Sequence, residues 1–251
     1  MIPIILKELS TELEKLKLES VKINAIPVNT EESLTIIQSK FLGIPYLPLQ
    51  YEYPKDKNGK PMILIAQINF EEIPHIENYP ESGILQLFIS STDWYDMDDY
   101  KIIYHDEATN EHQTKFPFLM EDLYEDSPVY CEHKLEFIKT TEFGGTEDHR
   151  FNLRFNNMDF YEFCETLTQD ECKTVENFLD ATGHKIGGYA YFTQSDPRDY
   201  EKKVREDILL LQIDTDEQIM FGDSGIANLF IHPDDLKNKN FDKAWFNWDC
   251  C

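Results

Sequence analysis

An internal similarity between two parts of the chain constrains its fold more than any other feature of the sequence. Five residues recur 145 positions further along: Lys40, Gly43, Tyr46, Gln67 and Ile68 match Lys185, Gly188, Tyr191, Gln212 and Ile213. The segments SGILQLFIS (82–90) and SGIANLFIH (224–232) then share six of nine residues at a separation of 142. A nearly constant separation across several short matches predicts a tandem duplication of about 30–90 and 168–232.

Each repeat begins with a helical pattern and continues with strands. Thr168 and Glu171 have the spacing of a capping box, and in the first repeat Asn29 or Thr30 would cap a helix that continues to Phe41. The apolar blocks that follow are bounded by Gly and Pro and joined by short turns, which favours antiparallel strands.

The chain is therefore expected to adopt an α+β, mainly β fold. We expect antiparallel, roll-like sheets with an internal tandem duplication and a few peripheral helices. Its 251 residues would form a single compact domain, in which an acidic, aromatic-rich insert at about 91–165 separates the repeats.

The charge balance limits the classes of partner. The chain has 48 acidic and 23 basic residues and a formal net charge of −25, which disfavours nucleic acid because phosphate recognition needs clustered Lys and Arg. No apolar run approaches the ~18 residues of a membrane span. The beginning of the chain reads as an amphipathic helix with leucines at 6, 9, 13 and 16, not as an export signal. These features predict a cytoplasmic protein with no membrane partner.

The tetrapeptide Gly222-Asp223-Ser224-Gly225 resembles the nucleophile motif of chymotrypsin-like proteases. It aligns, however, with Pro80-Glu81-Ser82-Gly83 of the first repeat, and both precede an apolar strand. A turn in which Gly225 supplies a positive φ explains both copies. We therefore expect no catalytic role for Ser224.

Other motifs of catalysis and cofactor binding fail on spacing. Asp93, Asp96 and Asp98 lack the spacing and final Glu of a calcium loop, and the five cysteines match no zinc pattern. Neither Gly144-Gly145 nor Gly187-Gly188 belongs to a phosphate-binding loop. The sequence predicts no catalytic residue, metal site or cofactor.

The matched polar residues have two open interpretations. Gln67 and Gln212 interrupt buried strands, so each must be hydrogen-bonded within its own repeat or contribute to a cleft between the repeats. The candidate residues for such a ligand or partner cleft are Lys40, Tyr46, Gln67, Lys185, Tyr191, Arg198, Gln212 and Asp223.

The segment 91–130 is the candidate partner surface. It carries eleven acidic residues against two lysines, a net charge of −9, interleaved with aromatic residues. A basic protein would be attracted by Asp96, Asp98 and Asp99 and anchored on Trp94 and Tyr95. The alternative is that this segment only keeps the protein soluble.

Seven blocks along the chain together resemble the YwqG-like family, a domain of unknown function. They are GIPYLP, PMILIAQINF, YPESGILQLFI, HKIGGYAYFTQSDPR, ILLLQID, FGDSGIANLFI and FDKAWFNWDC. The resemblance implies a mainly β, roll-like fold with an internal repeat, no established activity, and an immunity or interaction role for some relatives. The leading functional hypothesis is accordingly a non-catalytic protein-interaction module, with an immunity or scaffold role. The alternative is a small-ligand binder or enzyme that uses a cleft between the repeats.

Overall fold

The computed structural model describes residues 1–28 and 33–251. Within these residues ten strands form one antiparallel sheet: β1 (Leu18–Pro27), β2 (Lys40–Phe41), β3 (Ile63–Asn69), β4 (Ile84–Ile89), β5 (Tyr100–His105), β6 (His133–Glu142), β7 (Lys185–Gly187), β8 (Ile208–Ile213), β9 (Ile226–Ile231) and β10 (Trp245–Asp249). The strand order is β10-β9-β8-β7-β1-β6-β2-β3-β4-β5. The expected α+β, mainly β class with antiparallel strands is confirmed.

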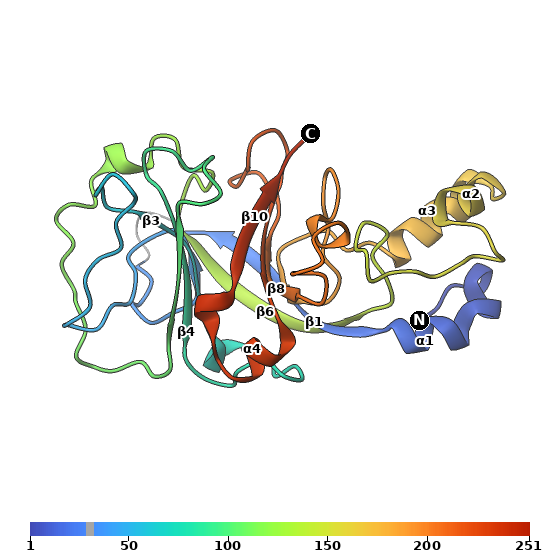
Figure 1. Ribbon diagram of the computed structural model, residues 1–251, viewed down its shortest axis with the longest axis horizontal. Helices are drawn as coiled ribbons and strands as arrows, with labels where there is room; N and C mark the ends of the chain where they lie inside the picture. The colour runs from blue at the N-terminus through green and yellow to red at the C-terminus, as the bar shows by residue number, and fades with distance from the viewer. Residues whose placement is uncertain (29–32) are drawn as a thin grey trace.

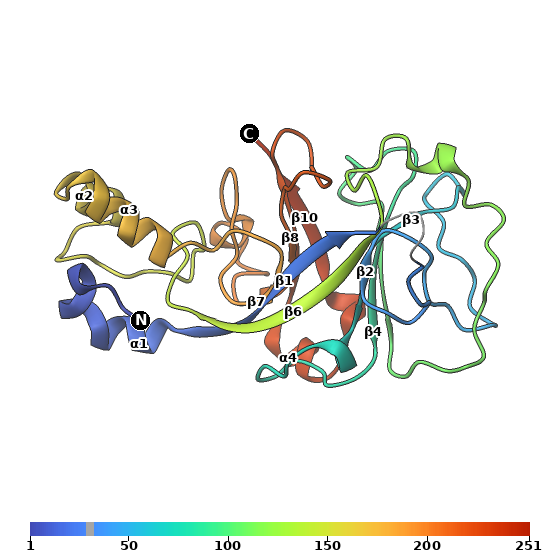
Figure 2. The ribbon, with the colours of Figure 1, turned by 180° about the vertical axis from the view of Figure 1, so that it is seen from behind.

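The strand order is the same on both sides of a central pair. β1 and β6 are long and antiparallel, with Asn24 opposite Glu136 at their middle, and they cross the molecule in Figures 1 and 2. In the sheet, β2–β5 lie beside β6, and we call these strands the first half. β7–β10 lie beside β1, and we call them the second half. β1 therefore pairs with a strand of the second half, although the first half follows it in the sequence. β6 pairs with a strand of the first half, although the second half follows it.

Strand registers also match between the halves. Lys40 lies opposite Gln67 in the first half, and Lys185 lies opposite Gln212 in the second. A register shift interrupts β3 against β4 and recurs in β8 against β9. The sequence-based insert at 91–165 contains β5 and β6, so this segment supplies two strands of the sheet.

The two edge strands of the sheet approach each other through aromatic side chains. The Tyr100 ring of β5 lies 5.7 Å from the Phe246 ring of β10, and the Tyr104 ring lies 4.2 Å from that of Phe241. The main buried apolar cluster accordingly contains residues of both halves, such as Leu87 and Leu229. The sheet is rolled around a shared core.

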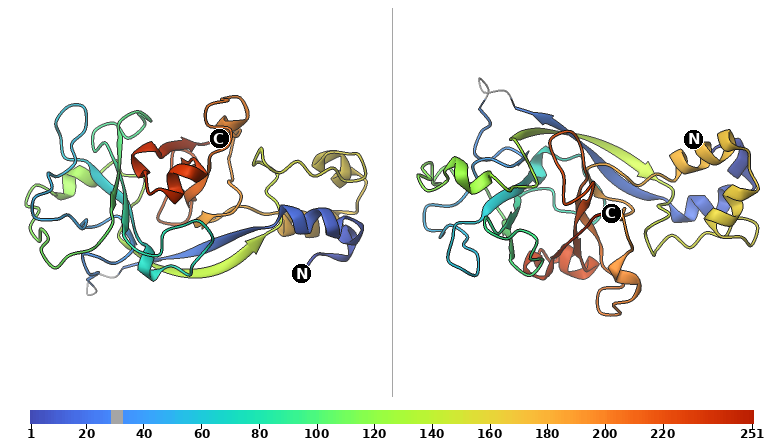
Figure 3. Two further views of the ribbon diagram at one scale, coloured as in Figure 1. Left: turned by 60° about the horizontal axis from the view of Figure 1, so that its bottom comes forward. Right: turned by 90° about the horizontal axis from the view of Figure 1, so that it is seen from above.

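Helices gather mainly at one end of the molecule (Figure 3). The α-helices are α1 (Ser10–Leu16), α2 (Phe160–Glu165), α3 (Gln169–Phe178) and α4 (Pro233–Lys237), and the short 3-10 helices are η1 (Ile4–Leu9), η2 (Phe70–Glu72), η3 (Glu121–Tyr124), η4 (Pro197–Asp199) and η5 (Phe241–Lys243). The capping box of Thr168 and Glu171 at α3 is confirmed. None of the helices in the described residues has the length and apolar character needed to cross a membrane.

This helical end arises because the β6–β7 connection is longer than the β1–β2 connection. The long connection contains α2 and α3, which pack on the N-terminal helices through a separate apolar cluster that includes Leu6, Leu13 and Val175. Residues 143–184 are therefore the part of the second half that has no counterpart of similar length in the first.

The prediction of a helix that continues to Phe41 is wrong for residues 33–41, the part of it that the structure describes. Asn29 and Thr30, its expected caps, lie outside the described residues. Residues 33–39 contain a turn instead of a helix. The backbone carbonyls here are bound by side chains of β3: Gln67 Nε2 donates to those of Ile36 and Gln38. These bonds hold a non-helical backbone that local propensity alone does not favour.

Candidate functional site

The matched glutamines each bind backbone groups of their own half. Gln67 Oε1 accepts the Tyr46 N–H at 2.8 Å, while its Nε2 donates to the carbonyls of Ile36 and Gln38 at 2.7 and 2.9 Å. The side chain is fully buried, so these bonds satisfy polar groups that water cannot reach.

Gln212 makes the same three bonds in the second half. Its Oε1 accepts the Tyr191 N–H at 2.9 Å, and its Nε2 donates to the carbonyls of Ala181 and Gly183 at 2.9 and 2.8 Å. The structure thus places Gln67 with Tyr46, and Gln212 with Tyr191, in two separate hydrogen-bonded groups. We call these groups the glutamine clamps.

Two matched lysines next to the clamps are buried in different surroundings. Lys40 Nζ donates to the carbonyls of Thr35 and Ile44 at 2.7 and 3.1 Å, and burial lowers its pKa to about 8 against the opposing charge of Glu132. Lys185 Nζ contacts both carboxylate oxygens of Glu142 at 3.1 Å. Burial also lowers the pKa of Lys185, although Glu142 opposes the shift.

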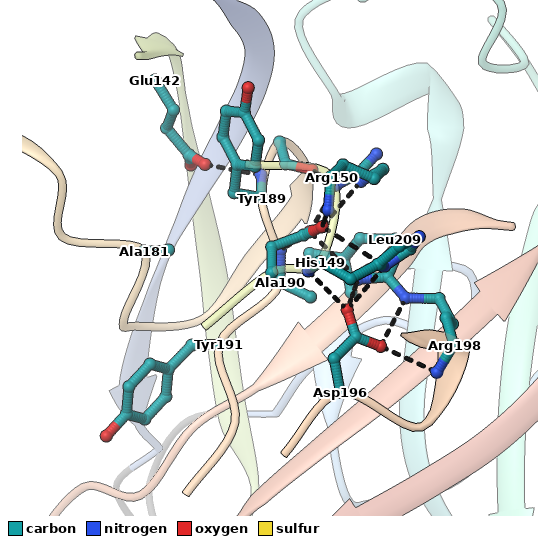
Figure 4. Close-up of polar contacts among 12 residues, drawn as sticks. Glu142, His149, Arg150, Ala181, Tyr189, Ala190, Tyr191, Asp196, Arg198 and Leu209 are labelled. Atoms are coloured by element: carbon teal, nitrogen blue, oxygen red, sulfur yellow. Dashed lines mark hydrogen bonds and ion pairs between the residues drawn. The ribbon is translucent and has the colours of Figure 1, made fainter. Parts of the chain in front are cut away.

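Five charged residues of the second half form a cluster beside the Gln212 clamp (Figure 4). This charge cluster consists of Asp148, His149, Arg150, Asp196 and Arg198. Arg198 is fully buried; its Nη2 lies 2.7 Å from Asp196 Oδ2 and 3.0 Å from Asp148 Oδ2. Arg150 binds Asp148 through Nε and Nη2 at 2.9 and 2.6 Å. Asp148 thus bridges the two guanidinium groups.

His149 completes the charge cluster. Its Nδ1 lies 2.9 Å from Asp196 Oδ2, and its Nε2 lies 2.8 Å from the carbonyl oxygen of Arg205. Both neighbouring atoms are oxygens that can accept a hydrogen bond, so the imidazole ring is held between two acceptors. The cluster thus combines two guanidinium groups and two carboxylates with one imidazole.

The charge cluster is built for ion pairing. Asp148, His149 and Asp196 are close enough together to suggest a metal site. However, both carboxylates already accept bonds from arginine, and both nitrogens of His149 already lie within hydrogen-bond distance of protein oxygens. Burial alone would raise the pKa of Asp148, but the charges of Arg150 and Arg198 outweigh it and hold that pKa well below the usual range.

Arg150 connects the charge cluster to a pocket between the halves. This interhalf pocket has a volume of about 270 Å³ and is lined by Lys17, Leu18, Glu19, Ile76, Glu77, Asn78, Tyr79, Arg150, Gly188 and Ile208. Residues 76–79 follow β3 of the first half, whereas Arg150 and Ile208 belong to the second. The Tyr79 hydroxyl donates to the Leu209 carbonyl, which joins the halves directly.

A second pocket lies at the opposite end of the molecule from α2 and α3. This apolar pocket has a volume of about 260 Å³ and is lined by Leu42, Gly43, Ile44, Phe116, Leu119, Tyr124 and Glu132. Among the described residues that line it, Glu132 contributes the one carboxylate. Burial raises the pKa of Glu132, although the nearby Lys40 opposes the shift.

The expected partner-surface residues are divided between the surface and the interior. Trp94 is buried, with its ring 5.8 Å from Phe221 and 5.1 Å from Trp248, while Tyr95 stacks on it and is 59% exposed. Trp94 is therefore not available as a surface anchor in this conformation.

The three aspartates after Trp94 and Tyr95 also differ in their surroundings. Asp96 pairs with the Lys57 ammonium, and Asp99 accepts the Lys57 N–H at 3.2 Å. Asp98 is exposed. Two of the three carboxylates therefore bind the loop around Lys57.

The Gly222–Gly225 segment is a turn, but its geometry differs from the expectation. Positive φ occurs at Gly222 (64°) and Ser224 (54°), not at Gly225. Gly225 is needed for space, because a Cβ there would lie 2.1 Å from the carbonyl oxygen of Phe221. Asp223 and Ser224 are exposed on this turn.

Sequence reasoning found Arg198 but missed most of its surroundings. Asp148, His149 and Arg150 are consecutive, and their proximity to Asp196 depends on the long β6–β7 connection. The triplet of adjacent charged residues was the available signal. Glu132 gave no signal, because its pocket is formed by segments far apart in the sequence.

One family model matches most of the chain. It is described as "Domain of unknown function (DUF1963)" and matches residues 39–250. No match was found among curated proteins. The family description assigns no activity, so any functional conclusion depends on the chain's own residues.

Proposed function

We propose that this chain, which belongs to the DUF1963 family, is a non-catalytic binding protein whose partner is a basic protein. The partner would insert a Lys or Arg side chain into the apolar pocket. A closer relationship to the YwqG-like family, and an immunity or scaffold role for this chain, are part of the same proposal.

The apolar pocket carries this proposal because it combines apolar walls with one carboxylate. Lysine and arginine have an apolar stem and a charged head, so the stem would pack on Leu42, Phe116 and Leu119 while the head reaches Glu132. Among the described residues, none donates a hydrogen bond to the Glu132 carboxylate. A cationic group from a partner would supply that bond.

The surroundings of the pocket suit a basic partner as well. The connection from β5 to β6 contains seven carboxylates in residues 106–126 against the single Lys115. Four of them, Glu121, Asp122, Glu125 and Asp126, are exposed next to the pocket residues Leu119 and Tyr124. Such a concentration of negative charge speeds encounter with a positive surface. Exposed apolar side chains of Ile44 and Met120 add contact area.

Catalysis has less support than binding. The charge cluster could resemble an active site, but its carboxylates and His149 are occupied by ion pairs and hydrogen bonds. Catalysis needs a titratable group within reach of a substrate in a concave site. Glu132 is the carboxylate that the apolar pocket offers, and among the described residues that line the pocket the other titratable group is the Tyr124 phenol, whose pKa is raised by burial.

A short peptide tests the pocket directly. Acetyl-Leu-Arg-Leu-amide and its citrulline counterpart differ in charge but little in shape. In NMR titrations we expect the arginine peptide to shift signals of Ile44, Phe116 and Leu119, and the citrulline peptide to have little effect. Glu132→Gln should weaken binding about tenfold or more, since it removes a charge-assisted bond.

Glu136→Gln is the matched control, because Glu136 is exposed on β6, the strand that begins directly after Glu132, and does not line the pocket. Equal effects of the two substitutions, or equal binding of the two peptides, would refute the assignment of Glu132. The partner protein itself can be sought by affinity capture at two ionic strengths.

Association kinetics test the acidic surroundings. Replacing Glu121, Asp122, Glu125 and Asp126 by their amides should slow association with the recovered partner and flatten its salt dependence. Amide replacement of four exposed acids elsewhere, Glu8, Glu12, Asp170 and Glu201, is the control of equal charge. If both quadruple variants slow association equally, the net charge of the protein sets the association rate, and the proposed role of this surface is wrong.

A further inference from the structure

We propose that the interhalf pocket binds a small organic carboxylate through Arg150. This inference is independent of the apolar pocket, which lies at the other end of the sheet. It rests on the placement of one guanidinium group, the apolar walls around it, and the origin of those walls in both halves of the chain.

Arg150 is held rigidly on three sides. Its Nε and Nη2 bind the two carboxylate oxygens of Asp148, and Nη2 also donates to the Gly188 carbonyl at 2.7 Å. The guanidinium carbon lies 5.4 Å from the centre of the Tyr189 ring. Figure 4 shows this side chain at the margin of the charge cluster. The group is therefore ordered before any ligand arrives, which reduces the entropy lost on binding.

One nitrogen of this guanidinium remains available. Within the described residues, no acceptor is bonded to Arg150 Nη1, and the atom is not among the buried polar atoms that lack a partner. The side chain is 22% exposed and lines the interhalf pocket. Nη1 therefore presents its two N–H donors to the pocket.

A carboxylate matches these donors and the nearby charges. An oxygen anion at Nη1 would accept a charge-assisted hydrogen bond from the guanidinium group. Lys17, Glu19 and Glu77 also line the pocket; Lys17 is paired with Glu14 at 3.0 Å, and Glu19 is paired with Lys139 at 2.7 Å. The carboxylates of Glu19 and Glu77 disfavour a ligand with two or more negative charges. A monoanion is the better match.

The remaining walls select an apolar body for the ligand. Leu18, Ile76 and Ile208 line the pocket, together with Tyr79, whose hydroxyl is already bonded to Leu209. The volume of about 270 Å³ is slightly below the ~300 Å³ lower limit of typical ligand sites. The pocket therefore suits a carboxylate about the size of an aromatic or branched-chain acid.

Phenylacetate and its neutral analogue phenylacetamide are suitable probes. By NMR at low ionic strength, we expect phenylacetate to bind with saturation and shift signals of Tyr79 and Ile208, and phenylacetamide to bind at least tenfold more weakly. Arg150→Met should abolish this preference for the charged probe. Because Arg150 also pairs with buried Asp148, its replacement can disturb folding, and a second variant is needed.

Ile208→Trp is that second variant, since it fills the pocket without changing a charge. It should abolish phenylacetate binding, whereas Ile138→Trp, at an exposed position of β6, should leave binding unchanged. Equal affinity for the two probes, no binding of phenylacetate, or full binding in Ile208→Trp would overturn the proposal. None of these results would bear on binding at the apolar pocket.

Discussion

Lys40 and Lys185 occupy matching places in the two halves of the sheet, and their ammonium groups are bound by different acceptors. Lys40 lies opposite Gln67 and donates to two backbone carbonyls, whereas Lys185 lies opposite Gln212 and contacts Glu142. The two positions therefore combine a common backbone arrangement with different electrostatic surroundings.

Lys40 should make the protein more stable as the pH rises from 7 to 10. Its pKa is about 8 in the folded protein and close to 10.5 when unfolded, so the unfolded chain binds more protons between these values. Stability then increases with pH in that window, by roughly 2–3 kcal/mol. Urea denaturation of the wild type and Lys40→Met should show the wild type gaining by this amount relative to the variant. A constant difference from pH 7 to 10 would contradict the shift.

Loss of Arg198 should be strongly destabilising. Asp148 and Asp196 would keep their charges in the interior with one cation fewer, which typically costs about 3–5 kcal/mol. We expect Arg198→Met to lower the free energy of unfolding by this amount. Arg205→Met is the control, because the Arg205–Asp199 pair is exposed and should contribute at most about 1 kcal/mol. Similar losses in both variants would argue against a tightly coupled charge cluster.

The glutamine clamps should contribute independently to stability. Gln67→Leu and Gln212→Leu each leave buried backbone groups without partners, at a cost of about 1–3 kcal/mol per unsatisfied group. Because the clamps share no hydrogen-bond partner, their effects should add in the double variant to within about 0.5 kcal/mol. Denaturant unfolding of the two single variants and the double variant tests this, and a coupling above about 1 kcal/mol would show that the clamps act together.

Ser224 and Gly225 should differ sharply in their tolerance of substitution. Ser224→Ala should change the free energy of unfolding by at most about 1 kcal/mol, the value of one local hydrogen bond, and a fluorophosphonate probe should not label Ser224. Gly225→Ala should cost much more, since its Cβ would meet the backbone oxygens of Phe221 and Asp249. Thermal unfolding of both variants decides the matter; equal melting temperatures would be incompatible with this steric argument.

The sequence predicted the strands of the two repeats, but neither β1 nor the equivalence of β1 and β6 as central strands. The blocks around Gln67 and Gln212 are buried on both faces, so their residues are restricted and the similarity is visible. β1 and β6 are partly exposed along their length and have few residues in common. Their equivalence becomes visible through pairing, since Lys22 faces Lys185 and Lys134 faces Lys40.

The candidate sites could be predicted only in fragments. Arg198 was among the predicted cleft residues. Its partner Asp148, however, belongs to the β6–β7 connection, whose path depends on tertiary packing. The two pockets combine residues more than fifty positions apart, such as Leu42 with Phe116 and Tyr79 with Arg150. Local spacing carries no information on such combinations.

β1 and β6 each pair with the half that is more distant in the sequence, and this arrangement has a consequence for synthesis of the chain on the ribosome. β1 pairs with β6 and β7, and β6 begins about a hundred residues after β1 ends. At a synthesis rate of ~5–20 residues per second, roughly 5–20 s pass between the synthesis of β1 and that of its first partner strand. β2 can pair with β3 soon after both are made, but it lacks its second neighbour until β6 has been made. The nascent first half therefore has an incomplete sheet edge during elongation, the state in which a holdase chaperone would bind it.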